Sequence, residues 1–453
     1  MRYYRAQLES TGHARGGSML TQAQNDRLTR VGPGTPMGTL MRRYWHPIAG
    51  SSELNEENPT KEVRLLGEDL VLFRSTAGRV GLIEPSCPHR KANLSYGVPE
   101  PEGIRCAYHG WLFDESGNCV DQPSEPAGSR FKDKVKITAY RTEELGGLIF
   151  AYMGPEPAPL LPRYEILVRD GIRGAWSVAL PCNWLQCHEN SLDPLHFQWL
   201  HRYWGGWQMN RRLPPEKRDV FNAASQVRGA DHHKIGFEIT SYGVIKRRLV
   251  GDETELDPHW RLGHPIFFPN ILWVGASLQF RVPVDDYNTL HMMLDWRPLE
   301  SEESINETVP FREVPFRKPN GEIELVYDFS GPSYDFGSPS SFIAAAIAQD
   351  QAAWVIEGAI MDRTTERLGV SDAGIIMFRR LLEEQMQLVE SSDADPMNTY
   401  RDPATNAMIQ APCERFDYTG YEGIRGGPFA NIEVNNDVEV LLSGEGSQLS
   451  EWR

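Results

Sequence analysis

Residues 87–111, CPHRKANLSYGVPEPEGIRCAYHGW, bring two cysteines and two histidines into two short segments. The first segment is Cys87-Pro-His89 and the second is Cys106-Ala-Tyr-His109. Thiolate ligands select zinc, copper(I) or iron–sulfur clusters. The flanking sequence consists of short alternating or apolar runs separated by Gly, Pro and Asn, which predicts β-strands joined by loops. We therefore expect a metal site held by two loops of a β domain.

A zinc site and a Rieske [2Fe–2S] cluster are the alternatives for these ligands. Zinc modules usually take their cysteines from one short loop and their histidines from a helix. In a Rieske centre, two cysteines bind one iron and two histidines bind the other. Each segment here supplies one cysteine and one histidine, and the pattern, followed by Gly110-Trp111, resembles the Rieske family. We expect the cluster ligands to be Cys87, His89, Cys106 and His109.

The composition argues against several classes of partner. The 453 residues include 46 Lys and Arg against 62 Asp and Glu, which gives a net charge of −16. Nucleic acids and anionic membranes need a positive protein surface, so we expect neither as a partner. Six cysteines are too few for a disulfide scaffold. The N-terminal residues lack the apolar core of a signal peptide, and no apolar run could cross a bilayer, which predicts a cytoplasmic protein.

The patterns along the chain predict three regions. A loosely ordered extension comes first, then a short helix for which Thr21 is a candidate N-cap. β patterns follow as far as a proline-rich stretch at 154–164, and helical patterns dominate from Ser341 to Ser391. We expect an N-terminal extension with a helix, a Rieske domain and a larger α+β domain, at residues 1–45, 46–155 and 156–453.

Residues 183–201, NWLQCHENSLDPLHFQWLH, carry a second set of candidate ligands. They resemble the N-W…E-N-x-x-D-x-x-H-x-x-x-x-H motif of Rieske non-haem iron oxygenases. In that family two histidines and a later carboxylate hold a mononuclear Fe(II), so the resemblance implies that His196 and His201 are iron ligands. Such a facial triad leaves positions open for O2. Taken alone, the two histidines could equally be polar residues of an amphipathic helix.

The spacing of these histidines predicts an irregular helix. Residues five apart on a straight α-helix are about 140° out of phase, so His196 and His201 cannot share a face there. A π-type widening or a break would bring them together. Pro194 favours a break, because it disfavours a helical Asp193 and suits the first turn of a new helix.

Asp350, in AIAQDQAAWVIEGAI, is the candidate for the third ligand. It interrupts an alanine-rich helix face that is expected to be buried, and a buried carboxylate needs a partner such as a metal. The segment also resembles that of phthalate-dioxygenase-type enzymes, in which the Asp after Gln is the ligand. Glu357 is the local alternative, and a solvent-facing Asp350 is another.

The resemblance extends over nearly the whole chain, including VGPGTPMGTLMRRYWHPI (31–48) and RLLGEDLVLFR. It is a resemblance to the oxygenase (alpha) component of Rieske non-haem iron aromatic ring-hydroxylating oxygenases, in the phthalate-dioxygenase-like branch. The implied fold is an all-β Rieske domain followed by a larger α+β, helix-grip-type catalytic domain with an antiparallel sheet and C-terminal helices. The implied cofactors are a [2Fe–2S] Rieske cluster and a mononuclear Fe(II).

The resemblance also implies partners. Electrons come from a separate NAD(P)H-dependent reductase with flavin and a [2Fe–2S] domain, or from a ferredoxin, and the chain shows no GxGxxG or P-loop of its own. Family members form head-to-tail trimers, sometimes stacked as hexamers. Asp193 matches the residue that bridges the two metal centres, through His196 and a Rieske histidine, His109, of a neighbour. Asn190 matches a residue near the iron. Alternatively, Asp193 only caps the helix that begins at Pro194.

The reaction implied by the resemblance is oxidation of an aromatic compound with O2. Substrates of this branch are often carboxylates, which call for arginine. Our candidates are Arg261 and, behind it, Lys246, Arg247 and Arg248, although such residues are more often surface charges.

The segments GHPIFFPNILWVG and LQFRVPVDD resemble the 5,5'-dehydrodivanillate type of O-demethylase, so we expect O-demethylation of a lignin-derived methoxyaromatic acid. The alternatives are a cis-dihydroxylating dioxygenase of the phthalate type and a Rieske electron-transfer protein without oxygenase activity.

Other cysteines and histidines are not expected to bind metal. Cys119, Cys182, Cys187 and Cys413 lack ligand spacing and are expected to be small buried side chains. His188 lies close to the candidate iron ligands, but the family motif does not use it. The pair His232-His233 lies in a polar pattern and is expected to be solvated.

Overall fold

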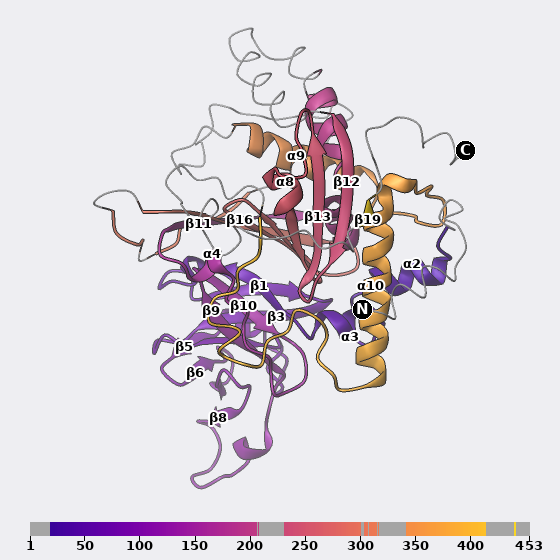
Figure 1. Ribbon diagram of the computed structural model, residues 1–453. Helices are drawn as coiled ribbons and strands as arrows, with labels where there is room; N and C mark the ends of the chain where they lie inside the picture. Colours follow the sequence, from indigo (N-terminus) through magenta and orange to yellow (C-terminus); the bar gives the residue numbers. More distant parts are fainter. Residues whose placement is uncertain are drawn as a thin grey trace.

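The structure is a computed structural model that describes residues 19–205, 207, 231–299, 303–306, 308–314, 316, 341–413 and 439–440 (Figure 1). Three β-sheets and a group of helices make up these residues. The loosely ordered extension expected before Met19 lies outside the described residues. Within the described ranges, no helix is both long and apolar enough to cross a bilayer.

Two short helices precede the sheets and pack against a helix from the C-terminal part of the chain. The first, α2 (Gln22–Thr29), begins at Thr21, whose hydroxyl accepts a hydrogen bond from the Gln24 amide in a capping box, which confirms the expected N-cap. The second, α3 (Pro36–Met41), follows. Both pack against the long C-terminal helix α10 (Ala373–Ser391), as Figure 1 shows.

The N-terminal domain contains two antiparallel sheets. The six-stranded sheet has the order β1-β10-β9-β4-β3-β2, and the four-stranded sheet has the order β5-β6-β7-β8. A small core that includes Val71, Phe73, Ile104 and Phe113 joins them. The strands are β1 (Trp45–Gly50), β2 (Thr60–Leu65), β3 (Glu68–Arg74), β4 (Val80–Ile83), β5 (Val98–Glu100), β6 (Gly103–Arg105), β7 (Leu112–Phe113), β8 (Cys119–Asp121), β9 (Ala139–Leu145) and β10 (Leu148–Tyr152).

The larger domain is built on a nine-stranded sheet of order β18-β11-β17-β16-β15-β14-β13-β12-β19, antiparallel except for the β11–β18 pair. The run ILWVGASLQFRVPV forms two strands joined by a turn at Gly275, where φ is +56°. The strands are β11 (Ile172–Leu180), β12 (His232–Ile239), β13 (Gly243–Val250), β14 (His264–Phe267), β15 (Ile271–Val274), β16 (Ser277–Pro283), β17 (Thr289–Arg297), β18 (Phe311–Glu313) and β19 (Glu439–Val440).

Helices accompany this sheet, so the expected α+β architecture with C-terminal helices is confirmed. The helical pattern from Ser341 to Ser391 forms two helices, α9 (Ser341–Ile356) and α10. The remaining helices are α4 (Glu165–Val168), α5 (Trp184–Glu189), α8 (Pro258–Arg261), the π-helix η5 (Phe197–Trp204) and the 3-10 turns η1 (Ser51–Glu53), η2 (Leu94–Tyr96), η3 (Lys132–Lys134), η4 (Asn190–Leu192) and η6 (Val370–Asp372).

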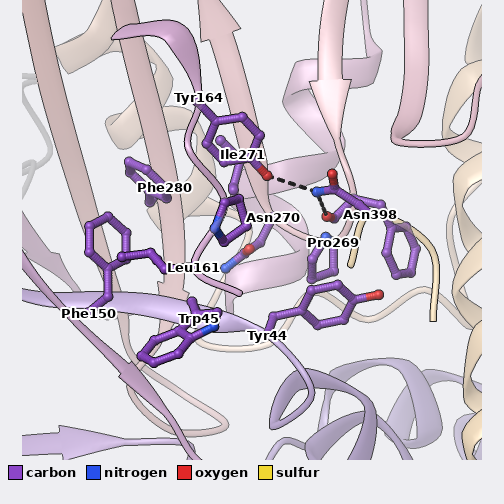
Figure 2. A pocket seen from close by; sticks show the side chains of 12 residues that line it. Tyr44, Trp45, Phe150, Leu161, Tyr164, Pro269, Asn270, Ile271, Phe280 and Asn398 are labelled. Atoms are coloured by element: carbon purple, nitrogen blue, oxygen red, sulfur yellow. Dashed lines mark hydrogen bonds between the residues drawn. The ribbon is translucent and has the colours of Figure 1, made fainter. Parts of the chain in front are cut away.

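An aromatic seam joins the two sheet systems. Phe150 of β10 meets Phe280 of β16 edge to face, with ring centroids 6.0 Å apart. Beside it lies a small cavity, in which Asn398 donates hydrogen bonds to Tyr164 Oη (2.9 Å) and to the Phe268 carbonyl (2.7 Å) (Figure 2). Because strands up to Tyr152 lie on one side of this seam and strands from Ile172 on the other, we propose the domain division at residues 155/156.

Candidate functional site

The two loops that carry the Cys–His segments have the same backbone form. The amide of Cys87 donates to the Ala92 carbonyl (2.9 Å), and the amide of Cys106 donates to the Trp111 carbonyl (2.8 Å). Each cysteine carbonyl accepts from the amide four residues later, and that residue has a positive φ in both loops, +59° at Lys91 and +78° at Gly110. The loops are therefore structural equivalents, each presenting one thiol and one imidazole.

The thiols of this site are buried and the imidazoles face outwards. Cys87 and Cys106 are 1% and 3% exposed, whereas His89 is exposed and His109 is partly exposed. The His89 and His109 rings lie 4.5 Å apart between centroids, and His89 stacks on Trp111. Burial, reinforced by the neighbouring Cys106, raises the pKa of the Cys87 thiol to about 11. A bound metal would reverse this, because metal ligation requires the thiolate. If His89 and His109 bind the second iron of a cluster, that iron would lie at the surface, where electrons could reach it.

The second site lies where the helical segment after β11 becomes irregular. The helix α5 passes into η4, the chain turns extended at Asp193 (φ −97°, ψ 110°), and η5 then begins after His196. Because a π-helix repeats its hydrogen bonds every five residues, it brings His196 and His201 onto one side. The irregular helix predicted from the histidine spacing and from Pro194 is confirmed.

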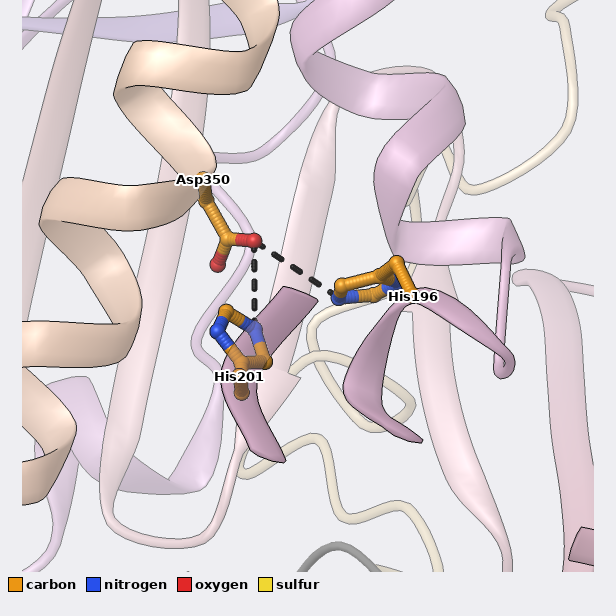
Figure 3. Close-up of side chains that lie close together, drawn as sticks. All are labelled: His196, His201 and Asp350. Carbon is orange, nitrogen blue, oxygen red and sulfur yellow. Dashed lines mark ion pairs between the residues drawn. The ribbon is translucent and has the colours of Figure 1, made fainter. Parts of the chain in front are cut away.

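Asp350 meets these two histidines from α9, as Figure 3 shows. Its Oδ1 lies 3.6 Å from His196 Nε2 and 3.2 Å from His201 Nε2. One ligand atom from each of the three residues lies within 4.8 Å of the others. Donors that bind a metal at about 2.1 Å stand about 3 Å apart, so this set needs only a small contraction to hold an ion. Two imidazoles and one carboxylate are the donor set of the non-haem iron facial triad.

Each histidine is oriented through its other ring nitrogen. His201 Nδ1 donates to Gln349 Oε1 (2.7 Å), and His196 Nδ1 donates to the Asp193 carbonyl (2.6 Å). In the neutral form of each ring, these hydrogen bonds place the proton on Nδ1 and leave Nε2, which faces Asp350, as the metal-binding atom. Burial lowers the pKa of His196 to about 3, so its ring is neutral at pH 7, the form that binds metal. The sequence reasoning missed Gln349, which is 1% exposed in the structure and lies next to Asp350 in the chain.

Asn190 and Asp193 both contact this group. Asn190 Nδ2 donates to Asp350 Oδ1 across 3.3 Å. The Asp193 carboxylate accepts from the Leu195 amide (2.8 Å), and its other oxygen lies 3.7 Å from His196 Nδ1. Asp193 therefore has the contact expected of a helix cap and also a second contact with the imidazole. Glu357, the alternative third ligand, is exposed beyond the end of α9 and is not among these metal-capable residues.

A buried ion-pair network anchors α5 close to this site. Glu189 Oε2 lies 2.6 Å from Arg363, and its Oε1 lies 2.5 Å from Arg379. Burial alone would raise the pKa of Glu189, but the two arginines outweigh it and lower the pKa below its ordinary value. The sequence reasoning did not identify this network, because its members are far apart in the chain.

The two arginines suggested for substrate binding, Arg247 and Arg261, meet at α8. The Arg247 guanidinium donates to Glu238, to the Trp260 carbonyl (2.6 Å) and to the Arg261 carbonyl (2.8 Å). It therefore supports α8, the helix on which Arg261 lies. Successive side chains of a strand point to opposite faces, so Lys246 and Arg248 face the other side of β13. This placement argues against Arg247 as a ligand of a substrate held beside His196, and Arg261 stays a prediction.

Comparison with known proteins identifies the class. Residues 44–140 match the family model of the Rieske [2Fe-2S] domain, and residues 340–409 match the model described as LigXa C-terminal domain like. The chain is 41% identical to the 5,5'-dehydrodivanillate O-demethylase oxygenase subunit of Sphingobium sp. (strain NBRC 103272 / SYK-6), over 87% of each chain. It is 33% identical to the phthalate 4,5-dioxygenase oxygenase subunit of Pseudomonas putida, over 83% of this chain and 88% of that subunit.

A solved structure has the same fold. It is the reduced complex between oxygenase and ferredoxin in carbazole 1,9a-dioxygenase, which matches with a TM-score of 0.52 and 19% identity over 86% of this chain and 98% of that chain. The chain belongs to the family of Rieske non-haem iron oxygenases, as an oxygenase subunit of the branch that includes these relatives. It is an oxidoreductase whose cofactors are a Rieske [2Fe–2S] cluster and a mononuclear iron.

Proposed function

We propose that this protein is the terminal oxygenase that removes a methyl group from a methoxylated aromatic acid. The observation that carries the proposal is the group His196, His201 and Asp350, a donor set that would leave coordination positions of a bound iron open. The 41% identity to an oxygenase subunit named for 5,5'-dehydrodivanillate O-demethylation supports the choice of reaction.

In this proposal the two donor sets have separate roles. Cys87, Cys106, His89 and His109 hold the cluster, and the group around Asp350 holds the iron. When bound, the iron supplies the activation of O2. Gln349 and Asp193 keep the two imidazoles in the orientation and tautomer that ligation needs.

The proposed reaction needs O2, two electrons and two protons for each methoxyl group. One oxygen atom is inserted into a C–H bond of the methyl group, which gives a hemiacetal, and the other oxygen atom leaves as water. The hemiacetal then breaks its C–O bond to give a phenol and formaldehyde. Burial raises the pKa of the Asp193 carboxyl, which lies beside the His196 ring.

The chain needs an electron source and a route between the metal sites. We propose a separate ferredoxin or NAD(P)H-dependent reductase, in keeping with a related oxygenase solved together with ferredoxin. We also propose a homotrimer or hexamer in which Asp193 of one subunit meets a Rieske histidine, His109, of the next. The exposed His89 and the exposed aromatic residues Trp199 (58%) and Tyr203 (70%) on η5 support such a contact. A cytoplasmic location stays a prediction.

Product analysis tests the reaction. The holoenzyme, supplied with a ferredoxin reductase system, NADH and O2, should release one formaldehyde for each methoxyl group lost from 5,5'-dehydrodivanillate. His196→Ala should abolish turnover and leave the EPR signal of the reduced cluster intact. An electron carrier without oxygenase activity would have no turnover for this substitution to abolish. A cis-diol without formaldehyde would instead favour the phthalate-type reaction, which the 33% identical relative keeps as the second candidate.

A further inference from the structure

The face of the large sheet that packs against α9 contains a buried arginine without a carboxylate partner. Arg281, on β16, is 1% exposed. Its Nη2 donates to Gln279 Oε1 (2.9 Å) and its Nη1 donates to the Gln279 carbonyl (3.2 Å). Among the residues that the structure describes, no aspartate or glutamate forms an ion pair with it, and its Nε has no hydrogen-bond partner. Because arginines are almost never fully buried unless they are paired, this charge calls for an explanation.

A chain of hydrogen bonds ties Arg281 to the helix that carries Asp350. His291 lies directly opposite Arg281 in the pairing of β16 with β17. Gln351, on α9, donates from Nε2 to His291 Nδ1 (3.0 Å). Burial lowers the pKa of His291 well below its ordinary value, so the ring is neutral and its proton lies on Nε2. This Nε2 donates to Gln279 Oε1 (3.3 Å), the oxygen that also accepts from Arg281, so the guanidinium has a fixed position relative to α9.

Arg281 contacts α9 one turn after Asp350. Asp350 and Trp354 are four residues apart on this helix and therefore lie on the same face of it. The Arg281 guanidinium carbon lies 5.5 Å from the centre of the Trp354 ring. Burial lowers the pKa of Arg281 to about 10, while the nearby Cys187 and Asp350 act in the opposite direction. The guanidinium is therefore positively charged at pH 7, and its charge interacts with that of Asp350.

We propose that Arg281 supplies a fixed positive charge to the iron site and thereby favours the ferrous over the ferric form of the iron held by His196, His201 and Asp350. Arg281 is not a ligand and acts through space, because a positive charge repels Fe(III) more strongly than Fe(II). A higher reduction potential of this iron favours electron transfer to it from the cluster. This inference rests on the iron site of the proposed function and goes beyond the proposed reaction.

A redox titration of the holoenzyme, followed by the EPR signal of the high-spin ferric iron, tests this role without turnover. Arg281→Met should lower the ratio of ferrous to ferric iron at a fixed potential by about 10-fold, as expected for charges on the order of 10 Å apart at an effective dielectric constant of about 20. This change corresponds to a fall of about 59 mV in the reduction potential. Arg281→Lys keeps the charge, so its ratio should stay within about threefold of that of the wild type.

A second variant neutralises the charge with little change of shape. Gln279→Glu places a carboxylate where Arg281 already donates a hydrogen bond, so it should lower the ratio in the same way as Arg281→Met. The matched control is Arg173→Met on β11, because Arg173 is also buried and donates to backbone carbonyls. Arg173 lies opposite Trp296, which is five residues and about 17 Å along β17 from His291. Its removal should change the ratio by less than about threefold.

The outcomes separate the two proposals. An Arg281→Met variant with a ratio within about threefold of the wild type would overturn the role of Arg281. An equal fall in Arg281→Lys or in Arg173→Met would also contradict it, because the effect would then not depend on a charge at this place. If Arg281→Met does not fold, Gln279→Glu decides by the same criterion. A ferric signal that persists in His196→Ala would refute both this role and the proposed iron site. A potential that shifts as expected in an enzyme that releases no formaldehyde would keep the role of Arg281 and remove O-demethylation.

Discussion

Gln349 accepts a hydrogen bond of 2.7 Å from Nδ1 of His201, so that the residue next to Asp350 orients the histidine that Asp350 faces. Two consecutive residues of α9 thus act on the two nitrogens of one imidazole. Because α9 is a single helix, a shift of its backbone would move the carboxylate and the orienting amide together. The relative positions of these groups are therefore set by the helix itself.

Gln349→Leu should weaken iron binding by about 10- to 100-fold, because the His201 ring loses the acceptor that fixes its tautomer. Gln349→Glu keeps an acceptor at the same place and serves as the control. Iron retained after dialysis against a weak chelator measures the effect, with the EPR signal of the reduced cluster as an internal reference. Equal iron retention in the Leu variant would show that the hydrogen bond has no orienting role.

Gly110→Ala and Lys91→Gly, at the equivalent positions of the two Rieske loops, should not change the stability of the domain in the same direction. Gly110 has φ +78°, and a Cβ there would lie 2.9 Å from Pro123 Cγ, so Gly110→Ala should destabilise the domain by about 1–2 kcal/mol or more. Lys91 has φ +59° and is strained in the same way, so Lys91→Gly should be neutral or stabilise by up to about 1 kcal/mol. The temperature at which the cluster absorbance is lost measures the stability of both variants. If both substitutions lowered this temperature, the two loops would not be structural equivalents.

Glu189→Gln should lower the free energy of unfolding by about 3–5 kcal/mol, because Arg363 and Arg379 would be left buried without their anion. Glu390→Gln, which breaks the exposed pair with Arg27, should cost at most about 1 kcal/mol. Since the fold lowers the pKa of Glu189, its contribution is present above the ordinary carboxyl pKa and is lost as the pH falls through the lowered value. Urea titrations at pH 7 measure the free energy of unfolding of the two variants. Equal losses in Glu189→Gln and Glu390→Gln would contradict the prediction that the buried pair matters more than the exposed one.

His46 should make the protein less stable in mild acid. Burial lowers its pKa to about 4, although its ring contacts the Met41 carbonyl, so the unfolded chain binds a proton more readily than the folded one. Stability from this residue is full above pH about 6.5 and falls by about 3 kcal/mol as the pH drops to about 4. His46→Gln should flatten the stability curve in that interval, as measured by urea unfolding at a series of pH values. A curve of unchanged slope would assign the acid sensitivity to other groups.

Short sequence patterns were enough to predict those site features that depend on residues close together in the chain. The five-residue step from His196 to His201, with Pro194 before it, predicted the irregular helix that the structure contains. A single charge in an apolar helix pointed to Asp350, and paired Cys–His segments pointed to two equivalent loops.

Features that depend on register and on distant partners could not be predicted in this way. Arg247 and Arg248 are neighbours in sequence, and only the pairing of β13 decides which of them faces η5. An irregular pairing at the start of β12 turns His232 inwards, which no polarity pattern reveals. Glu189 finds its arginines more than 170 residues away.

The packing of α2 and α3 against α10 has a mechanical consequence. The Rieske domain is fastened to the rest of its chain both before its first strand, where Arg27 meets Glu383 and Glu390, and after its last strand. A Rieske domain attached at both of its ends is not expected to rotate about a single hinge and carry electrons to a distant site. In the trimer or hexamer proposed above, the approach of this cluster to an iron atom comes from how whole subunits pack against one another. We therefore expect that dilution or a broken subunit contact would stop electron delivery while every ligand stays in place.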